Sequence, residues 1–171
     1  PRDFLFPLVD PAVIPGRDVA GLNAANKRKW QKEVVSGDRV VGIEIGDSSR
    51  AYPMFMLDAH EIVQDQIGDT PIVIARSPLI DEVAVFERSL DGVPLDFGVS
   101  GLLDDLSLVM HDRDPAAASL LSGHDGRFIA GPQVGRQLNP VPGVSVTTWR
   151  DWLARHPETD VALRDVGSLQ R

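Results

Sequence analysis

The residues that could support acid–base or metal chemistry in this 171-residue chain are four histidines and a larger set of carboxylates. His60-Glu61 matches the start of the zinc-protease helix motif, but position 64 is glutamine, so a second imidazole is missing from that helical face. Gly98-Val-Ser100-Gly101 is similar to a serine nucleophile elbow whose second glycine comes one position early. A turn that ends a strand is the better interpretation of that string.

His60 and His111 are the more interesting histidines because both lie in apolar runs with acidic neighbours, and Met110 directly precedes His111. Imidazole and thioether ligands together suit copper. A residual metal site that uses His60, His111 and Met110 therefore stays open, and so does a hydrolase that combines His60 with a carboxylate. We favour a simpler interpretation, in which each histidine is a hydrogen-bonded structural residue and the protein uses neither metal nor cofactor.

The composition excludes several classes of chemistry. The chain contains no cysteine, so disulfides, thiolate nucleophiles and cysteine-held metals are excluded. Lys and Arg number 17 against 25 Asp and Glu, and the net charge of −8 repels phosphate backbones, so we expect no nucleic-acid binding. No stretch approaches the roughly 20 apolar residues that span a bilayer, so any membrane association should be peripheral rather than transmembrane.

Residues 1–22 form a proline-rich, apolar segment. Proline at this density disfavours a helix or a central strand, so the segment should run as an extended arm. Its apolar side chains are too numerous for a free linker. They either cover the core of the domain itself or dock on a partner protein, and the docking candidates are Phe4, Leu5, Phe6, Leu8 and Val9.

Residues 23–163 mix the period of two that is typical of strands with short helical segments. This pattern predicts one α+β domain, with a β-rich mixed or antiparallel sheet and a few short helices. Residues 164–171 are expected to form a loosely held tail. The expected strands are residues 40–45, 50–53, 71–75, 83–86, 95–99, 106–111, 127–130 and 161–163, and the expected helices are residues 23–35, 54–59, 115–121 and 147–155.

Two local patterns are specific enough to predict geometry. Asp91-Gly92 should form a tight hairpin turn, after which residues 95–99 pair back on residues 83–86. In the last helix, Thr147 or Thr148 is the expected N-cap. The spacing of three and four residues places Trp149, Trp152 and Leu153 on one face, which suits packing on a sheet.

Several strings in a fixed order resemble a bacterial family known as domain of unknown function 3179. The likeness covers roughly residues 38–163, and each string alone is weak. The strings are Val41-Gly-Ile-Glu-Ile-Gly46, Arg50-Ala-Tyr-Pro53, His60-Glu-Ile-Val63 with Asp65, Phe97-Gly-Val-Ser-Gly-Leu-Leu103, Leu108-Val-Met110 with Asp112-Arg113, Gly131-Pro132, and Thr148-Trp149 with Trp152 and Arg155-His-Pro157.

The resemblance implies a location outside the cytoplasm, because members of that family are typically exported or anchored to the membrane. It also implies a Cys-Pro-Leu-Cys-Gly string, a candidate for redox or metal chemistry. Here that string is Ser77-Pro-Leu-Ile-Asp81, so Ser77 and Ile80 replace the two cysteines, and His111 replaces the family's usual tyrosine. Within this degenerate family centre of His60, Ser77 and Ile80, only His60 keeps the residue that the family has.

We therefore expect a non-catalytic accessory or scaffold subunit in the periplasm or elsewhere outside the cytoplasm. It would dock on protein partners in a larger complex, and a membrane-bound respiratory or photosynthetic complex would be a suitable host. The apolar arm is the expected docking element. The metal-binding protein and the unrecognised hydrolase remain the alternatives.

Overall fold

The computed structural model describes residues 16–18, 34–116 and 118–162. The described residues form two compact units, and each is built from segments that are far apart in the sequence. The first, here called the site unit, contains residues 60–65 and 71–141. The second, here called the tryptophan unit, contains the described parts of residues 14–59, 66–70 and 142–171.

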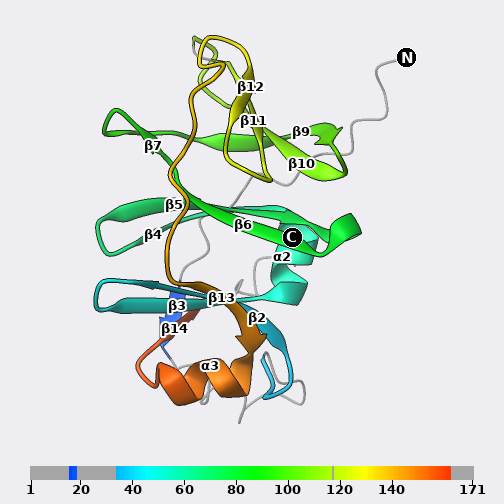
Figure 1. Ribbon diagram of the computed structural model, residues 1–171. Coiled ribbons are helices and arrows are strands. Elements are labelled where there is room, and N and C mark those ends of the chain that lie inside the picture. Colours follow the sequence, from blue (N-terminus) through cyan, green and yellow to red (C-terminus); the bar gives the residue numbers. More distant parts are fainter. Residues whose placement is uncertain (1–15, 19–33, 117, 163–171) are drawn as a thin grey trace, which may run out of the picture. The chain divides into compact units, whose positions relative to one another are not determined.

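Neighbouring strands of the site unit pair mostly in antiparallel fashion (Figure 1), and β4, β5 and β10 are buried along most of their length. β5 lies between β4 and β6, and a four-stranded sheet has the order β12-β11-β10-β9. The bounds are β4 Ile62–Ile67, β5 Thr70–Ser77, the 3₁₀ helix η1 Pro78–Ile80, β6 Glu82–Glu87, β7 Ser89–Leu90, β8 Val93–Pro94, β9 Phe97–Asp104, β10 Ser107–Asp112, β11 Leu120–Ser122 and β12 Phe128–Ala130.

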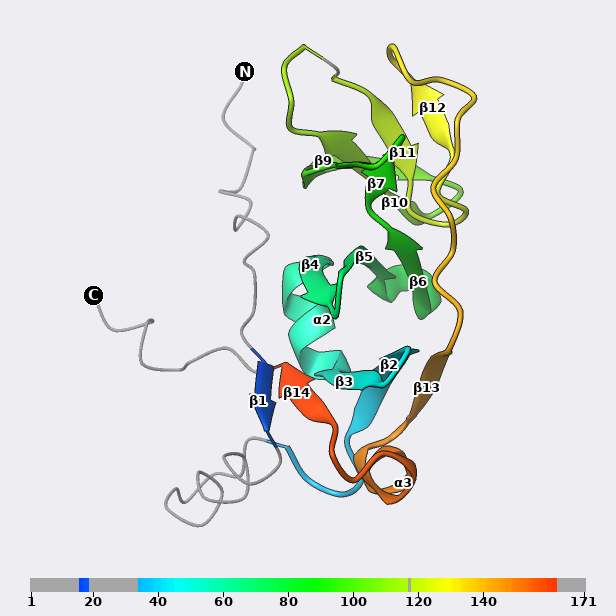
Figure 2. The same ribbon diagram turned by 90° about the vertical axis from the view of Figure 1, so that its left-hand side faces the viewer.

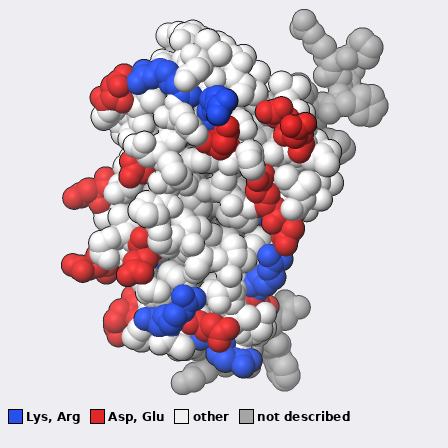
Figure 3. Space-filling model, viewed as in Figure 1, with Lys and Arg blue, Asp and Glu red and all other residues white. Residues whose placement is uncertain are grey.

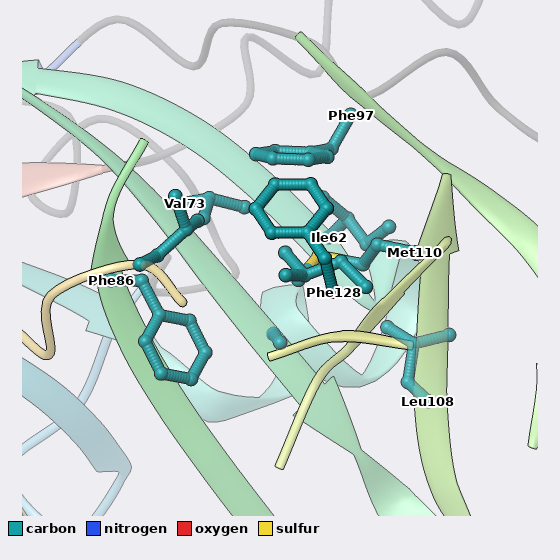
Figure 4. Packing of buried hydrophobic residues seen from close by; sticks show 10 residues of the cluster. Ile62, Val73, Phe86, Phe97, Leu108, Met110 and Phe128 are labelled. Carbon is teal, nitrogen blue, oxygen red and sulfur yellow. The ribbon is translucent and has the colours of Figure 1, made fainter. Parts of the chain in front are cut away.

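The core of the site unit is built from aromatic and aliphatic side chains of these strands. In Figure 4 the rings of Phe97 and Phe128 lie next to one another, with Ile62 and Met110 beside them. All four side chains are fully buried. Complete burial of such a side chain contributes about 1.5–3 kcal/mol, so these residues stabilise the sheets from which the loops of the site leave.

The tryptophan unit is a five-stranded sheet of order β1-β14-β3-β2-β13. β14 runs parallel to β3 and the other neighbours are antiparallel, so the sheet is mixed. Figure 2 shows β1, β14 and β3 side by side, and α3 nearly along its axis. The bounds are β1 Gly16–Asp18, β2 Arg39–Ile45, β3 Ser48–Pro53, α2 Met54–His60, β13 Val144–Thr148, α3 Trp149–Arg155 and β14 Asp160–Ala162.

α3 packs on this sheet through its tryptophans, which confirms the predicted face. Trp149 and Trp152 are buried together with Val40, Ala51 and Val161. The ring of Trp152 covers Gly42 so closely that a Cβ atom there would lie 2.2 Å from the ring. The predicted cap is also confirmed, because the side chain of Thr148 accepts a hydrogen bond from the Asp151 amide.

The β-rich character predicted from the sequence is confirmed, and the described helices are short. The expected strands at residues 40–45, 71–75, 106–111 and 127–130 are present, and the Asp91-Gly92 turn joins β7 to β8. None of the described helices is long and apolar enough to cross a membrane. The arm candidates Phe4, Leu5, Phe6, Leu8 and Val9, most of the helix expected at residues 23–35, and the tail at residues 164–171 lie outside the described residues.

Three local predictions were wrong. The pairing of residues 95–99 with residues 83–86 does not occur, because β6 pairs with β5 and β9 pairs with β10. The string that begins at Gly98 does not end a strand, since β9 continues to Asp104 through an irregular register. The helix expected at residues 115–121 is replaced by a turn at Asp114, whose carboxylate accepts from the Ala116 amide, and by β11. Leu120 and Leu121 pair with β10, and this pairing takes the end of the segment out of a helix.

Candidate functional site

Three chain connections of the site unit converge on one cleft of about 410 Å³. The first is the loop between β5 and β6, which carries Ile80 and Glu82. The second is the turn between β9 and β10, which carries Asp104, Asp105 and Ser107. The third follows β11 and carries Ser122, His124, Asp125 and Arg127, and Ile129 of β12 completes the wall.

A row of hydrogen bonds links the buried end of β5 to the cleft. The Leu108 amide donates to Ser77 Oγ at 2.8 Å, and the Oγ atoms of Ser77 and Ser107 lie 3.3 Å apart. Ser107 Oγ donates to Glu82 Oε2 at 2.7 Å, and His124 Nδ1 donates to Glu82 Oε1 at 2.5 Å. Since the proton of Ser107 goes to Glu82, Ser77 donates to Ser107, and every member of the row has a partner.

The order of groups in this row differs from that of a catalytic triad. In a triad the imidazole lies between the hydroxyl and the carboxylate, so that it can take the hydroxyl proton. Here the carboxylate of Glu82 lies between the Ser107 hydroxyl and the His124 imidazole. The row therefore fixes the positions of loops and does not activate a serine through the histidine.

His124 lies at the mouth of the cleft and is mostly exposed. The hydrogen bond to Glu82, together with the negative charge of that carboxylate, raises the pKa of His124 above its ordinary value of 6.5. The more distant carboxylates of Asp125 and Asp104 act in the same direction. The imidazole is therefore held in its charged form over a wider range of pH than a free histidine.

Arg76 fixes the position of the loop between β5 and β6 through contacts with Asp81 and Glu82. Its side chain is 5% exposed and forms an ion pair of 2.9 Å with Asp81, and it also donates to the carbonyl of Glu82 at 3.3 Å. Asp81 ends η1 in the left-handed conformation with φ 53°. A cation that lies so deep needs such partners, because removing one partner of a buried pair costs about 3–5 kcal/mol. The exposed position of Asp81 reduces that figure here.

The residues that replace the two cysteines have different environments. Ser77 is buried in the hydrogen-bonded row, whereas Ile80 is exposed and lines the cleft. His60, at the end of α2, is not among the residues that line the cleft. The degenerate family centre of His60, Ser77 and Ile80 is therefore not brought together around this cleft.

The alternative metal ligands are not brought together either. Met110 points into the core, while the ring of His111 lies against Gly98, where a Cβ atom would be 2.4 Å from Cε1 of the ring. Consecutive residues of a strand face opposite sides, so Met110 and His111 do not share one site. Among the described residues there is no group of three or more His, Asp or Glu side chains that could hold a metal ion.

Apolar side chains surround the outer end of the loop between β5 and β6 and the turn between β9 and β10. Leu79, Leu103 and Leu106 line a small hollow next to the cleft, and Leu79 is 73% exposed. We call the exposed apolar residues that line this hollow or the neighbouring cleft the apolar rim. Its members are Leu79, Ile80, Leu103, Leu106 and Ile129.

Acidic side chains border the apolar rim. Figure 3 shows them gathered on the right-hand side of the face in view, over the turn between β9 and β10 and the loop after β5. The acidic residues of these two connections are Asp81, Glu82, Asp104 and Asp105. Within the described part of the chain, Asp104 and Asp105 have no ion-pair partner, so their charges face solvent.

Sequence reasoning missed His124 and Ser107 as parts of this site. Glu82 and His124 are 42 positions apart, and Ser77 and Ser107 are 30 apart. Nothing in the local sequence signals these contacts, since they depend on how the sheets pair. The exposed leucines gave a weak signal, because Leu102, Leu103 and Leu106 form an apolar run around two aspartates.

A family described as a protein of unknown function, DUF3179, matches residues 11–171 of the chain. No curated protein and no solved structure matches it.

Proposed function

The chain belongs to the DUF3179 family, and we propose that it acts there as a non-catalytic subunit that binds another protein through the apolar rim. The observation that carries this proposal is the grouping of exposed leucines around Leu79, Leu103 and Leu106. Contiguous apolar surface on a soluble domain is a mark of protein interaction sites. Single exposed apolar residues would need no such explanation.

The groups beneath the rim support a structural role for the loops. Ser77 stands where the resemblance implies a cysteine. Its hydroxyl accepts a hydrogen bond from the Leu108 amide and donates one to Ser107. The chain has no cysteine, so it performs no thiol chemistry. The loop between β5 and β6 and the turn between β9 and β10 therefore serve to present apolar side chains.

The charge around the rim indicates which partner would fit. Asp104 and Asp105 have no ion-pair partner within the described residues and stand beside Leu106 on the same turn. A partner surface with apolar side chains flanked by Lys or Arg would match both features. An acidic partner would be repelled by this surface and by the net charge of −8.

The wider setting of the proposal comes from the sequence. A location outside the cytoplasm, peripheral association with a membrane-bound complex, and a second docking element at Phe4, Leu5, Phe6, Leu8 and Val9 remain predictions. Metal binding and hydrolysis are not favoured by any specific contact among the described residues.

Deletion of residues 1–22 tests the role of the arm. Loss of binding to the complex would support that role, and unchanged binding would remove it.

Charge substitution in the rim tests the main proposal. The full chain is purified by affinity from the organism that makes it, as the natural protein, as Leu79→Asp with Leu103→Asp, and as Val134→Asp. Val134 is a matched control because it is 60% exposed in the same unit but is not part of the rim. The natural protein and the control should retain the same partner, and the double variant should lose it. Equal retention by all three proteins would contradict the proposal.

A further inference from the structure

The turn between β9 and β10 holds a leucine in a conformation that leucine rarely adopts. Asp104 pairs with Ser107, so Asp105 and Leu106 form a two-residue hairpin loop. Both have positive φ, 47° for Asp105 and 68° for Leu106. Two positive φ values define a type I′ turn, for which Asn-Gly and Asp-Gly are the favoured sequences. Leucine in the second position strains the backbone, because its Cβ lies too close to the following carbonyl oxygen.

Burial does not offset this strain. The side chain of Leu106 is 56% exposed at the outer end of the hairpin, although it also lines the small hollow beside Leu79 and Leu103. Strained backbone that the fold itself does not require is found mainly where binding needs it. Glycine at this position would give the favoured Asp-Gly turn, so the fold gains nothing from leucine here.

We propose that Leu106 is the anchor of the docking face, which inserts into an apolar pocket of the partner protein while Asp104 and Asp105 pair with basic side chains around that pocket. This inference rests on the proposed function and adds the anchor residue and the partner's chemistry. Interface energy is concentrated in a few central side chains that become fully desolvated. A rigid hairpin presents such a side chain with little loss of conformational freedom on binding.

Substitution of the anchor separates folding from binding. Leu106→Gly removes the side chain and relieves the turn without any change in charge. Its melting temperature should therefore rise by about 2–4 °C. Its affinity for a peptide that carries apolar and basic side chains should fall about ten-fold or more, since the variant loses the central contact. Val134→Gly is the matched control: it removes an exposed apolar side chain outside the rim and should leave binding unchanged.

Two synthetic 12-residue peptides serve as probes, one with alternating leucine and lysine and one with alternating leucine and glutamate. Fluorescence anisotropy of the labelled peptides with the full chain measures binding. The lysine peptide should bind the natural protein and the Val134→Gly variant, and the glutamate peptide should not bind. Leu106→Gly should lose most of its affinity for the lysine peptide.

Other results would overturn the inference in distinguishable ways. Full binding by Leu106→Gly, with loss in Leu79→Asp and Leu103→Asp, would remove Leu106 as the anchor and leave the docking face. Binding that none of these substitutions affects would remove the proposed function as well. Equal binding of both peptides would contradict the basic partner. Self-association of the natural protein that Leu106→Gly abolishes, measured by sedimentation, would replace that partner with a second copy of the chain.

Discussion

Ser77 accepts a hydrogen bond of 2.8 Å from the backbone amide of Leu108, which joins the end of β5 to β10 through a single hydroxyl. Both residues are buried. The hydroxyl therefore satisfies a backbone donor that water cannot reach, and this explains why a polar residue stands at this position in the core.

Removal of that hydroxyl should destabilise the fold. Ser77→Ala leaves the Leu108 amide without an acceptor, and an unsatisfied buried donor costs about 1–3 kcal/mol. Urea unfolding should show this loss in the free energy of unfolding. Ser145→Ala is the control, because the Ser145 hydroxyl is buried with no hydrogen-bond partner among the residues that the structure describes, so its removal should cost nothing. Equal destabilisation by the two substitutions would show that the row of hydrogen bonds does not stabilise the site.

The pair of His124 and Glu82 should make stability depend on pH. The pKa of His124 is raised in the folded state, so the pair contributes stability that is fully present below the unfolded pKa of about 6.5 and is lost as pH rises through the folded pKa. His124→Ala should therefore destabilise the protein at pH 5.5 and have little effect at pH 9.

NMR titration of the imidazole checks the cause of that shift. Glu82→Gln removes the charge that holds the proton on His124, so the pKa of His124 should fall toward its ordinary value. Asp91→Asn serves as a control, because Asp91 pairs with Arg136 and not with the histidine. An unchanged pKa of His124 in Glu82→Gln would contradict the hydrogen bond between the two residues.

Much of the fold could be predicted because it is encoded locally. The apolar strand segments at residues 40–45 and 106–111, the Asp91-Gly92 turn and the Thr148 cap each depend on residues close together in the sequence. The site could not be predicted in this way, because Ser77, Ser107 and His124 meet only through the pairing of sheets. The expected helix at residues 115–121 failed for the same reason, since Leu120 and Leu121 pair with β10.

Because α3 packs closely on the sheet, a larger residue in place of Gly42 should destabilise the fold. In Gly42→Ala the new Cβ would lie 2.2 Å from the Trp152 ring, so the helix must move away from the sheet. Overpacking of this kind typically costs about 1–3 kcal/mol. Calorimetry should show a lower melting temperature for Gly42→Ala. Gly37→Ala is the control, because no atom of the described residues lies within 4 Å of a Cβ there, and a similar loss in that variant would contradict the packing.

Introduced thiols should report the different environments of the two positions where the resemblance implies cysteines. Ser77→Cys places a thiol in a buried position, whereas Ile80→Cys places one at the exposed wall of the cleft. Reaction with a thiol reagent in the folded state should be fast at position 80 and slow at position 77, because reactivity requires access to the thiolate. Equal rates would show that the loop between β5 and β6 opens readily.

Photo-cross-linking tests the central claim, that the apolar rim is the surface on which a partner protein docks. A photoreactive amino acid replaces Leu79 in one protein and Val134 in another, and both are irradiated in cells of the organism that makes the protein. The account predicts a covalent adduct with one other protein from position 79 and none from position 134. No adduct from position 79, or the same adducts from both positions, would contradict it.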